Sequence, residues 1–253
     1  MTPYTLALEL TLILATWLAI GAWQRESRAP GRLTFGFAAA CVTVWTAGTL
    51  LEARADTYVL ALRVRTLGML ALTPLWFGVA ARAVRLPLIR RTPWLPLLLI
   101  APFVPIYALL YAGPWSMLFI PLHGVPKAGF GPLLWWTLAY AWSLVLAGAV
   151  VLLRGALQAE SPELRRDRIK MAASVAFPLL ANLYWAWQLA QTGRSGMDLT
   201  PVTIAVTLIA FRRSILSGGV LHLARVAGGG RFLGQNGRLG PQTGDQPGQG
   251  PQQ

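Results

Sequence analysis

The chain has 253 residues, of which 55% are hydrophobic and only 12% are charged, and its mean hydropathy is +0.52. This composition is typical of one membrane domain without a second soluble domain. The formal net charge of +13 does not indicate nucleic acid, because the basic residues flank apolar stretches and favour anionic inner-leaflet lipid as the partner.

Seven apolar stretches follow one another along the chain, at residues 5–23, 33–51, 66–81, 94–112, 132–153, 171–190 and 201–216. Most approach the roughly 20 residues that a helix needs to cross about 30 Å of hydrocarbon. We therefore predict an all-α polytopic membrane protein, a bundle of seven transmembrane helices. The first stretch is expected to be retained, because no basic residue precedes it as in a secretory signal.

Arg and Lys are distributed unequally over the connections. Alternate connections and the C-terminal segment carry most of them, namely Arg25, Arg28, Arg32, Arg82, Arg85, Arg90, Arg91, Arg154, Arg165, Arg166, Arg168, Lys170, Arg212, Arg213, Arg225, Arg231 and Arg238. The other connections carry Arg54, Arg63, Arg65, Lys127 and Arg194. Because cytoplasmic loops are enriched in basic residues, this distribution predicts an N-terminus outside and a C-terminus inside.

The third stretch is preceded by Arg63 and Arg65. Its helix is therefore expected to start near Thr57 and to carry both arginines at headgroup level, where their side chains snorkel to the surface. Asp198, followed by Pro201, predicts the start of the seventh helix, with a polar cap and a proline in the first turn.

Prolines lie within several spans, and each removes one backbone hydrogen bond. They are Pro74, Pro102, Pro105 and Pro178. We expect kinks or local irregularity at these positions, with the freed carbonyl groups satisfied by neighbouring helices.

The composition changes after Val226 to mostly glycine, glutamine and proline, without apolar periodicity. Residues 1–226 are therefore predicted to form the seven-transmembrane domain, and residues 227–253 a disordered cytoplasmic tail.

Few residues are suited to catalysis, since the chain has 2 histidines, 1 cysteine and no phosphate-binding glycine loop. The lone Cys41 excludes an intrachain disulfide and metal clusters built on cysteine. Lys127 and Lys170 lie in connections, so no lysine is available for a retinal in the last helix. We predict no enzyme activity, no cofactor and no metal site.

Glu9 is the ionisable residue deepest within a span, and it should face the bundle and have a partner. Arg63 and Arg65 are the candidate partners at similar height. Such a pair either senses a ligand or a proton, or fixes the first helix to the third, and we favour the structural role.

The sixth span has a polar and aromatic stretch that includes Asn182 and Trp185, which share one helix face. Together with Trp45, Trp76 and Trp142 from other helices, these residues are candidates for an amphipathic pocket that opens outward. The alternative, which we favour, is helix–helix packing with interhelical hydrogen bonds.

Four groups of segments carry a family resemblance. They are Leu67-Gly68-Met69 with Pro74-Leu75-Trp76-Phe77, Gly131-Pro132-Leu133-Leu134-Trp135-Trp136 with Ala139-Tyr140, Pro178-Leu179-Leu180-Ala181-Asn182-Leu183-Tyr184, and Met197-Asp198-Leu199-Thr200-Pro201 with Phe211-Arg212-Arg213-Ser214-Ile215-Leu216. In their order and spacing they resemble helices three, five, six and seven of the N-terminal seven-transmembrane region of bacterial sensor histidine kinases, over residues 1–226.

The resemblance implies a sensory input domain in the bacterial inner membrane whose exit helix carries Arg212, Arg213, His222 and Arg225. No phosphoacceptor box or ATP-binding domain follows, so kinase activity is not carried over and His222 is interpreted as a spacer. We expect a partner protein in the membrane or cytoplasm to supply the output, and a homodimer is also compatible. A truncated kinase gene stays open, and the alternative function is a small-molecule transporter or permease-like protein.

Overall fold

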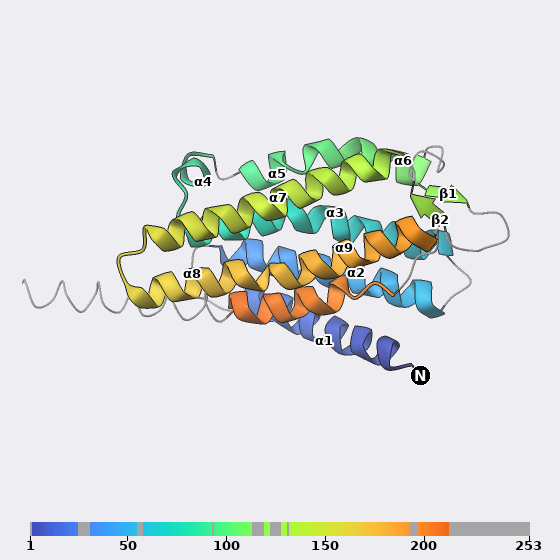
Figure 1. Cartoon of the computed structure of the whole chain (residues 1–253), viewed down its shortest axis with the longest axis horizontal. Helices are drawn as coiled ribbons and strands as arrows, with labels where there is room; N and C mark the ends of the chain where they lie inside the picture. Colours follow the sequence, from blue (N-terminus) through green and yellow to red (C-terminus); the bar gives the residue numbers. More distant parts are fainter. Residues whose placement is uncertain are drawn as a thin grey trace, which may run out of the picture.

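A computed structural model describes residues 2–24, 31–54, 58–92, 94–112, 119–121, 128–130, 132–192 and 197–212. The helices in these residues lie side by side along one axis, as expected for a transmembrane bundle (Figure 1). Among the described residues, 6 helices are long and apolar enough to cross a membrane, namely Pro3–Gln24, Arg32–Ala53, Leu60–Ala83, Leu95–Ala112, Trp135–Leu157 and Pro162–Gln188. With the shorter apolar helix Thr200–Arg212, they confirm the predicted order of spans.

The first three spans are the helices α1 (Pro3–Gln24), α2 (Arg32–Arg54) and α3 (Tyr58–Ala83). The helix α3 packs along α2 and also contacts α7 (Pro132–Leu157), while α2 contacts α1. The start of α3 at Tyr58 agrees with the prediction from the sequence. The helix α3 therefore lies at the centre of the bundle, between α2 and α7 (Figure 1).

Glycines permit the close contact between α2 and α3. A Cβ atom on Gly68 would lie 2.5 Å from the Cys41 carbonyl oxygen, and one on Gly48 would lie 2.3 Å from the Arg65 backbone nitrogen. Small residues are common where membrane helices approach each other closely, because apolar lipid provides no hydrophobic drive for association and packing must provide it.

The fourth span is broken, as its prolines predict. It comprises α5 (Leu95–Leu98), the 3-10 helix η1 (Ala101–Phe103) and α6 (Val104–Ala112), and it follows the short helix α4 (Pro87–Arg91). The hydroxyl group of Tyr140 on α7 donates a hydrogen bond of 3.1 Å to the Leu99 carbonyl group at the break. A neighbouring helix thus satisfies a carbonyl group in the irregular backbone.

The sixth span is also interrupted, between α8 (Pro162–Ser174) and α9 (Ala176–Thr192). Pro178 lies in the first turn of α9 and has no N–H group for the Ser174 carbonyl, four residues earlier. The Thr207 hydroxyl group donates to that carbonyl instead, at 2.7 Å. This contact confirms the expectation that a neighbouring helix satisfies a carbonyl group freed by proline.

A short antiparallel hairpin lies in the connection between α6 and α7, and the apolar pattern did not predict it. Its strands are β1 (Phe119–Pro121) and β2 (Ala128–Phe130), with Phe119 opposite Phe130. The hairpin and the N-terminus lie at the same end of the bundle (Figure 1). The opposite end contains α4, the start of α8 and the end of helix Thr200–Arg212, and their sequences contribute many of the basic residues.

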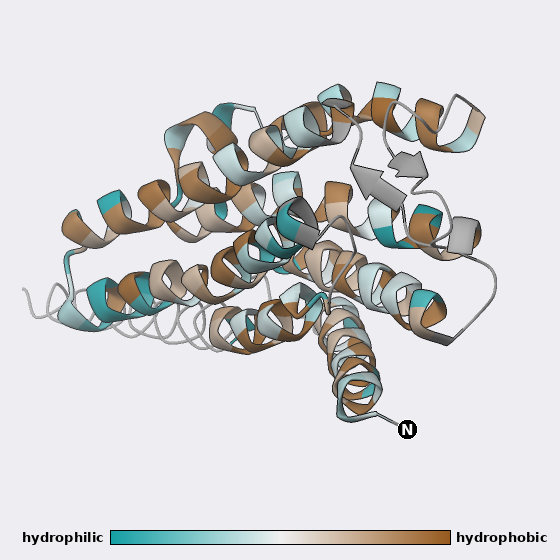
Figure 2. Ribbon diagram, turned by 45° about the vertical axis from the view of Figure 1, so that its right-hand side comes forward, coloured by the Kyte–Doolittle hydropathy of each residue, from teal (hydrophilic) through white to brown (hydrophobic). Residues whose placement is uncertain are grey.

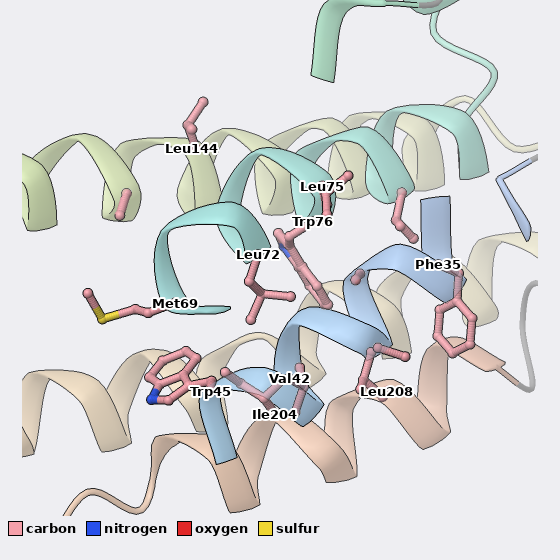
Figure 3. Close-up of a cluster of buried hydrophobic side chains, with 14 of the residues drawn as sticks. Phe35, Val42, Trp45, Met69, Leu72, Leu75, Trp76, Leu144, Ile204 and Leu208 are labelled. Atoms are coloured by element: carbon pink, nitrogen blue, oxygen red, sulfur yellow. The ribbon is translucent and has the colours of Figure 1, made fainter. Parts of the chain in front are cut away.

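Hydrophobic residues predominate along the helices of the bundle, and hydrophilic residues are frequent near the start of α8 (Figure 2). Large exposed side chains such as Trp17, Trp136 and Leu157 would contact water in a soluble protein. In a bilayer these side chains contact lipid, which explains why so many large apolar side chains are exposed on the bundle. The interior contains a continuous cluster of buried apolar side chains from α1, α2, α3, η1, α6, α7, α8 and helix Thr200–Arg212. Figure 3 shows the part of this cluster that lies between α2, α3, α7 and the C-terminal helix.

Candidate functional site

Arg65 on α3 forms two ion pairs inside the bundle, close to the end that carries the N-terminus. Its guanidinium nitrogens lie 2.8 Å from Glu52 Oε2 on α2 and 3.0 Å from Asp198 Oδ2, which precedes the C-terminal helix. Arg65 is only 5% exposed. The prediction that Arg65 snorkels to the membrane surface is therefore wrong, because two acidic partners allow its charge to lie in the interior.

Further contacts surround this ion cluster, which we define as Glu52, Arg65 and Asp198. The Tyr4 hydroxyl group on α1 donates to the Asp198 carbonyl at 3.1 Å, and the Arg65 guanidinium lies 4.8 Å from the centre of the Trp185 ring on α9. The cluster and its neighbours thus connect α1, α2, α3, α9 and the C-terminal helix. Breaking it would leave a charge buried without a counter-ion, which is costly in an apolar interior.

Asp198 also provides the polar cap before the C-terminal helix, as predicted. Its Oδ1 atom accepts a hydrogen bond of 3.0 Å from the Thr200 backbone N–H group. One carboxylate thus pairs with Arg65 through one oxygen and caps a helix through the other. The position of this helix is therefore tied to the ion cluster.

Arg65 forms its ion pairs with Glu52 and Asp198 and not with Glu9, which was one of the alternatives from the sequence. Arg63 donates hydrogen bonds to the carbonyls of Leu110 and Tyr111 at 3.2 and 3.5 Å, near the end of α6. Its guanidinium also lies 5.3 Å from the centre of the Tyr111 ring. These contacts join α3 to the broken fourth span, and the role expected for Glu9 stays a prediction.

A pocket of about 70 Å³ lies between the helices, and its lining includes Thr200, whose backbone N–H group donates to Asp198 of the ion cluster. It is bounded by α2, α3, α7, the junction of α8 with α9, and the C-terminal helix, which contributes Thr200, Ile204 and Thr207. Figure 3 shows Trp45, Met69, Leu72, Trp76 and Ile204, which line the pocket, among the other buried side chains of this region.

Four of the residues predicted for a pocket line this one, namely Trp45, Trp76, Trp142 and Asn182. Trp185 has a different position, since its ring lies against Arg65. The Trp142 indole N–H group donates to Asn182 Oδ1 at 2.7 Å. The structure therefore contains both the pocket and the interhelical hydrogen bond that were considered as alternatives, and binding of a ligand stays a prediction.

The C-terminal helix connects the pocket to the opposite end of the bundle. The ring of Phe211 lies 4.3 Å from the ring of Trp76, which lines the pocket. One residue later, the Arg212 guanidinium lies 4.0 Å from the centre of the Trp17 ring on α1. Arg213, His222 and Arg225, the other residues predicted for the exit helix, lie outside the described residues.

Glu52 and Asp198 were not predicted from the sequence as partners of Arg65. All three residues lie near span ends that were predicted on the same side of the membrane. The opposite charges of Arg65 and the two acidic residues at that side were the signal available in the sequence. Among the described residues, there is also no group of three or more His, Cys, Asp or Glu side chains able to hold a metal ion.

Comparison with known families gives one match over most of the chain. The family described as the N-terminal 7TM region of histidine kinase matches residues 7–224. This finding confirms the resemblance drawn from the sequence. A search among curated proteins gives no match.

Proposed function

We propose that this chain, which belongs to the family of N-terminal 7TM regions of histidine kinases, detects a stimulus within the membrane and passes it to a separate output protein. Family membership supports a membrane sensory input domain. The proposed additions are that the output comes from a partner and that the C-terminal helix carries the signal to it.

One observation carries this proposal, namely that helix Thr200–Arg212 contacts Asp198 of the ion cluster, lines the pocket and packs on α1 and α3. Its start is tied to Arg65 through Asp198, and its middle lines the pocket. Its end packs on Trp76 and Trp17 through Phe211 and Arg212. A change in the pocket therefore acts directly on the helix that leads into residues 213–226.

The proposed direction of signalling is from outside to inside. The ion cluster lies towards the end of the bundle that contains the N-terminus, and the basic elements lie at the other end (Figure 1). Under the positive-inside rule, the basic end faces the cytoplasm of the proposed bacterial inner membrane. The exit helix then delivers the signal to a cytoplasmic or membrane-bound kinase, cyclase or response regulator.

Site-specific photocrosslinking in native membranes tests the partner directly. The full chain is produced in its host with a photoreactive residue at Leu221 or Arg225, and crosslinked proteins are identified by mass spectrometry. The matched control carries the same photoreactive residue at Phe177, an exposed apolar position on α9.

We expect a kinase, cyclase or response regulator to be crosslinked at position 221 or 225 and not at position 177. Recovery of only lipid adducts and the chain itself from a well-expressed sample would contradict signalling through a separate protein. Movement of a small molecule across proteoliposomes that contain the purified chain would instead favour the transporter alternative.

A further inference from the structure

We propose that the basic end of the bundle binds the phosphate group of an anionic lipid between Arg85, which follows α3, and Arg168 on α8. This inference goes beyond the proposed sensory function, because it assigns a lipid site at the end of the bundle opposite the ion cluster. Its test measures lipid binding and needs no signalling partner, so the two proposals are confirmed or contradicted separately.

Arg85 and Arg168 are brought together at Gly155, near the end of α7. A Cβ atom on Gly155 would clash with the side chain of Val84, so the residue before Arg85 packs directly on α7. The guanidinium group of Arg168 donates a hydrogen bond to the Gly155 carbonyl. The end of α7 and the start of α8 lie at the same end of the bundle as α4, which follows Arg85 (Figure 1).

The positive charges of Arg85 and Arg168 have no counter-ion among the described residues. They lie close enough to repel each other electrostatically. In the described part of the chain no ion pair joins either arginine to an acidic side chain, although α8 contains Glu163 and Asp167. An anion between two like charges converts their repulsion into attraction, so this arrangement favours the binding of an anion.

The backbone of Arg85 is strained. Its φ angle of 56° is left-handed, and no other non-glycine residue among those described has a positive φ angle. The Leu86 N–H group donates to the Ala81 carbonyl at 2.9 Å, which closes the common C-terminal turn of a helix. Glycine usually occupies the left-handed position of this turn. An exposed arginine at that position is unfavourable for the backbone and is typical of a residue that contacts a ligand.

The surroundings indicate a lipid as the source of the anion. Leu153 and Leu157 on α7 and Leu88 on α4 are exposed apolar side chains, which contact acyl chains in a bilayer. Arg168 comes three residues before the apolar stretch 171–190, at the height of the headgroups. Guanidinium groups bind phosphate through parallel hydrogen bonds. The choline group of a zwitterionic lipid would add a positive charge, so an anionic lipid such as phosphatidylglycerol is favoured.

Native mass spectrometry of the purified full chain in detergent measures the dissociation constants for phosphatidylglycerol and phosphatidylcholine with identical acyl chains. The variant Arg85→Gln removes the charge but retains the strained backbone, whereas Arg85→Gly also relieves the strain. The matched control is Arg166→Gln, which removes one charge from an exposed position on α8. Thermal unfolding in phosphatidylcholine nanodiscs shows whether each variant is folded.

We expect the unsubstituted chain and R166Q to bind phosphatidylglycerol about tenfold more tightly than phosphatidylcholine, the effect of a charge-assisted hydrogen bond. R85Q and R85G should both lose this preference. In phosphatidylcholine nanodiscs, R85G should unfold at a temperature no lower than that of the unsubstituted chain, because glycine adopts the left-handed conformation without strain. Equal losses of preference in R85Q and R166Q would show that lipid responds only to net charge, and would overturn the inference.

Inorganic phosphate distinguishes a lipid headgroup from a soluble phosphate compound. In phosphatidylcholine nanodiscs, sodium phosphate should leave the unfolding midpoint the same as sodium chloride of equal ionic strength, because a free phosphate lacks the acyl chains that hold a lipid at the bundle. A phosphate-dependent rise in the midpoint that is lost in R85Q, with no preference for phosphatidylglycerol, would overturn the assignment to a lipid.

Discussion

The hydroxyl group of Thr207 on the C-terminal helix donates a hydrogen bond of 2.7 Å to the Ser174 carbonyl at the end of α8. Pro178, four residues after Ser174, cannot bond this carbonyl within its own helix. The membrane interior offers little water to replace the missing donor, so a neighbouring helix supplies it. Thr207 also lines the pocket, and the contact therefore joins the pocket to the interruption of the sixth span.

Replacing Thr207 by Val should lower the free energy of unfolding by about 1 kcal/mol, because the Ser174 carbonyl loses its donor. The same substitution in a Pro178→Ala background should cost close to nothing, since an alanine at that position has an N–H group for the carbonyl. Unfolding in mixed detergent micelles measures the free energies of unfolding of the unsubstituted chain, the two single variants and the double variant, which together form a double-mutant cycle. Additive costs for the two substitutions would show that Pro178 and Thr207 are independent.

The ion cluster should be essential for stability. Arg65→Met leaves Glu52 and Asp198 buried without a cation, and we expect a loss of about 3–5 kcal/mol in the free energy of unfolding. Arg65→Lys should lose less, because it retains the charge. The control is Arg166→Met, at an exposed position of α8, with an expected effect within about 0.5 kcal/mol. A mild effect of R65M, similar to that of R166M, would contradict a structural role of the cluster.

The two functions of Asp198 can be separated by substitution. Asn caps helices about as well as Asp, so Asp198→Asn should lose the ion pair with Arg65 but retain the cap on Thr200. Asp198→Ala should lose both and should be less stable than D198N by about 1 kcal/mol. Thermal unfolding of both variants in the same detergent provides the comparison. Equal midpoints would mean that the cap contributes nothing measurable.

Close packing of α2 and α3 predicts a strong dependence on glycine. Gly68→Ala places a methyl group against the Cys41 carbonyl and the Trp45 backbone, and we expect a loss of about 1–3 kcal/mol. Gly21 on α1 has no atom within 4 Å of a Cβ position, so Gly21→Ala should be neutral or slightly stabilising. Chemical denaturation of both variants tests the contrast, and an equal effect at the two positions would argue against a close α2–α3 contact.

The arrangement of spans could be predicted from the sequence because it depends on local properties. Length and apolarity identify a membrane helix without knowledge of its neighbours. The same is true of the irregular fourth span, since a proline removes its own hydrogen bond wherever it lies in a helix. The short hairpin of β1 and β2 was missed because a three-residue strand has no periodicity that can be recognised.

The pairing of side chains could not be predicted in the same way. Asp198 and Arg65 are 133 residues apart, and their contact depends on how each helix is rotated and which helices are neighbours. The sequence gives only the approximate depth of each charge, and on that basis Glu9 was matched with Arg63 or Arg65 at similar height. The tryptophans and Asn182 were candidates for a pocket because the sixth span has a polar and aromatic stretch on one face. Their hydrogen-bond partners, in contrast, required the structure.

The most direct test of the proposed signalling route is a distance measurement between spin labels at Leu157 on α7 and Ile209 on the C-terminal helix. Both positions are exposed, and Cys41→Ala removes the native thiol. Ala141 on α7 lines the pocket, so the substitution Ala141→Leu fills it and stands for a bound ligand. The control is Ala139→Leu, on an exposed face of the same helix. We predict that A141L shifts the label-to-label distance distribution and that A139L leaves it unchanged. Superimposable distributions in all three backgrounds would contradict coupling between the pocket and the helix that leaves the bundle.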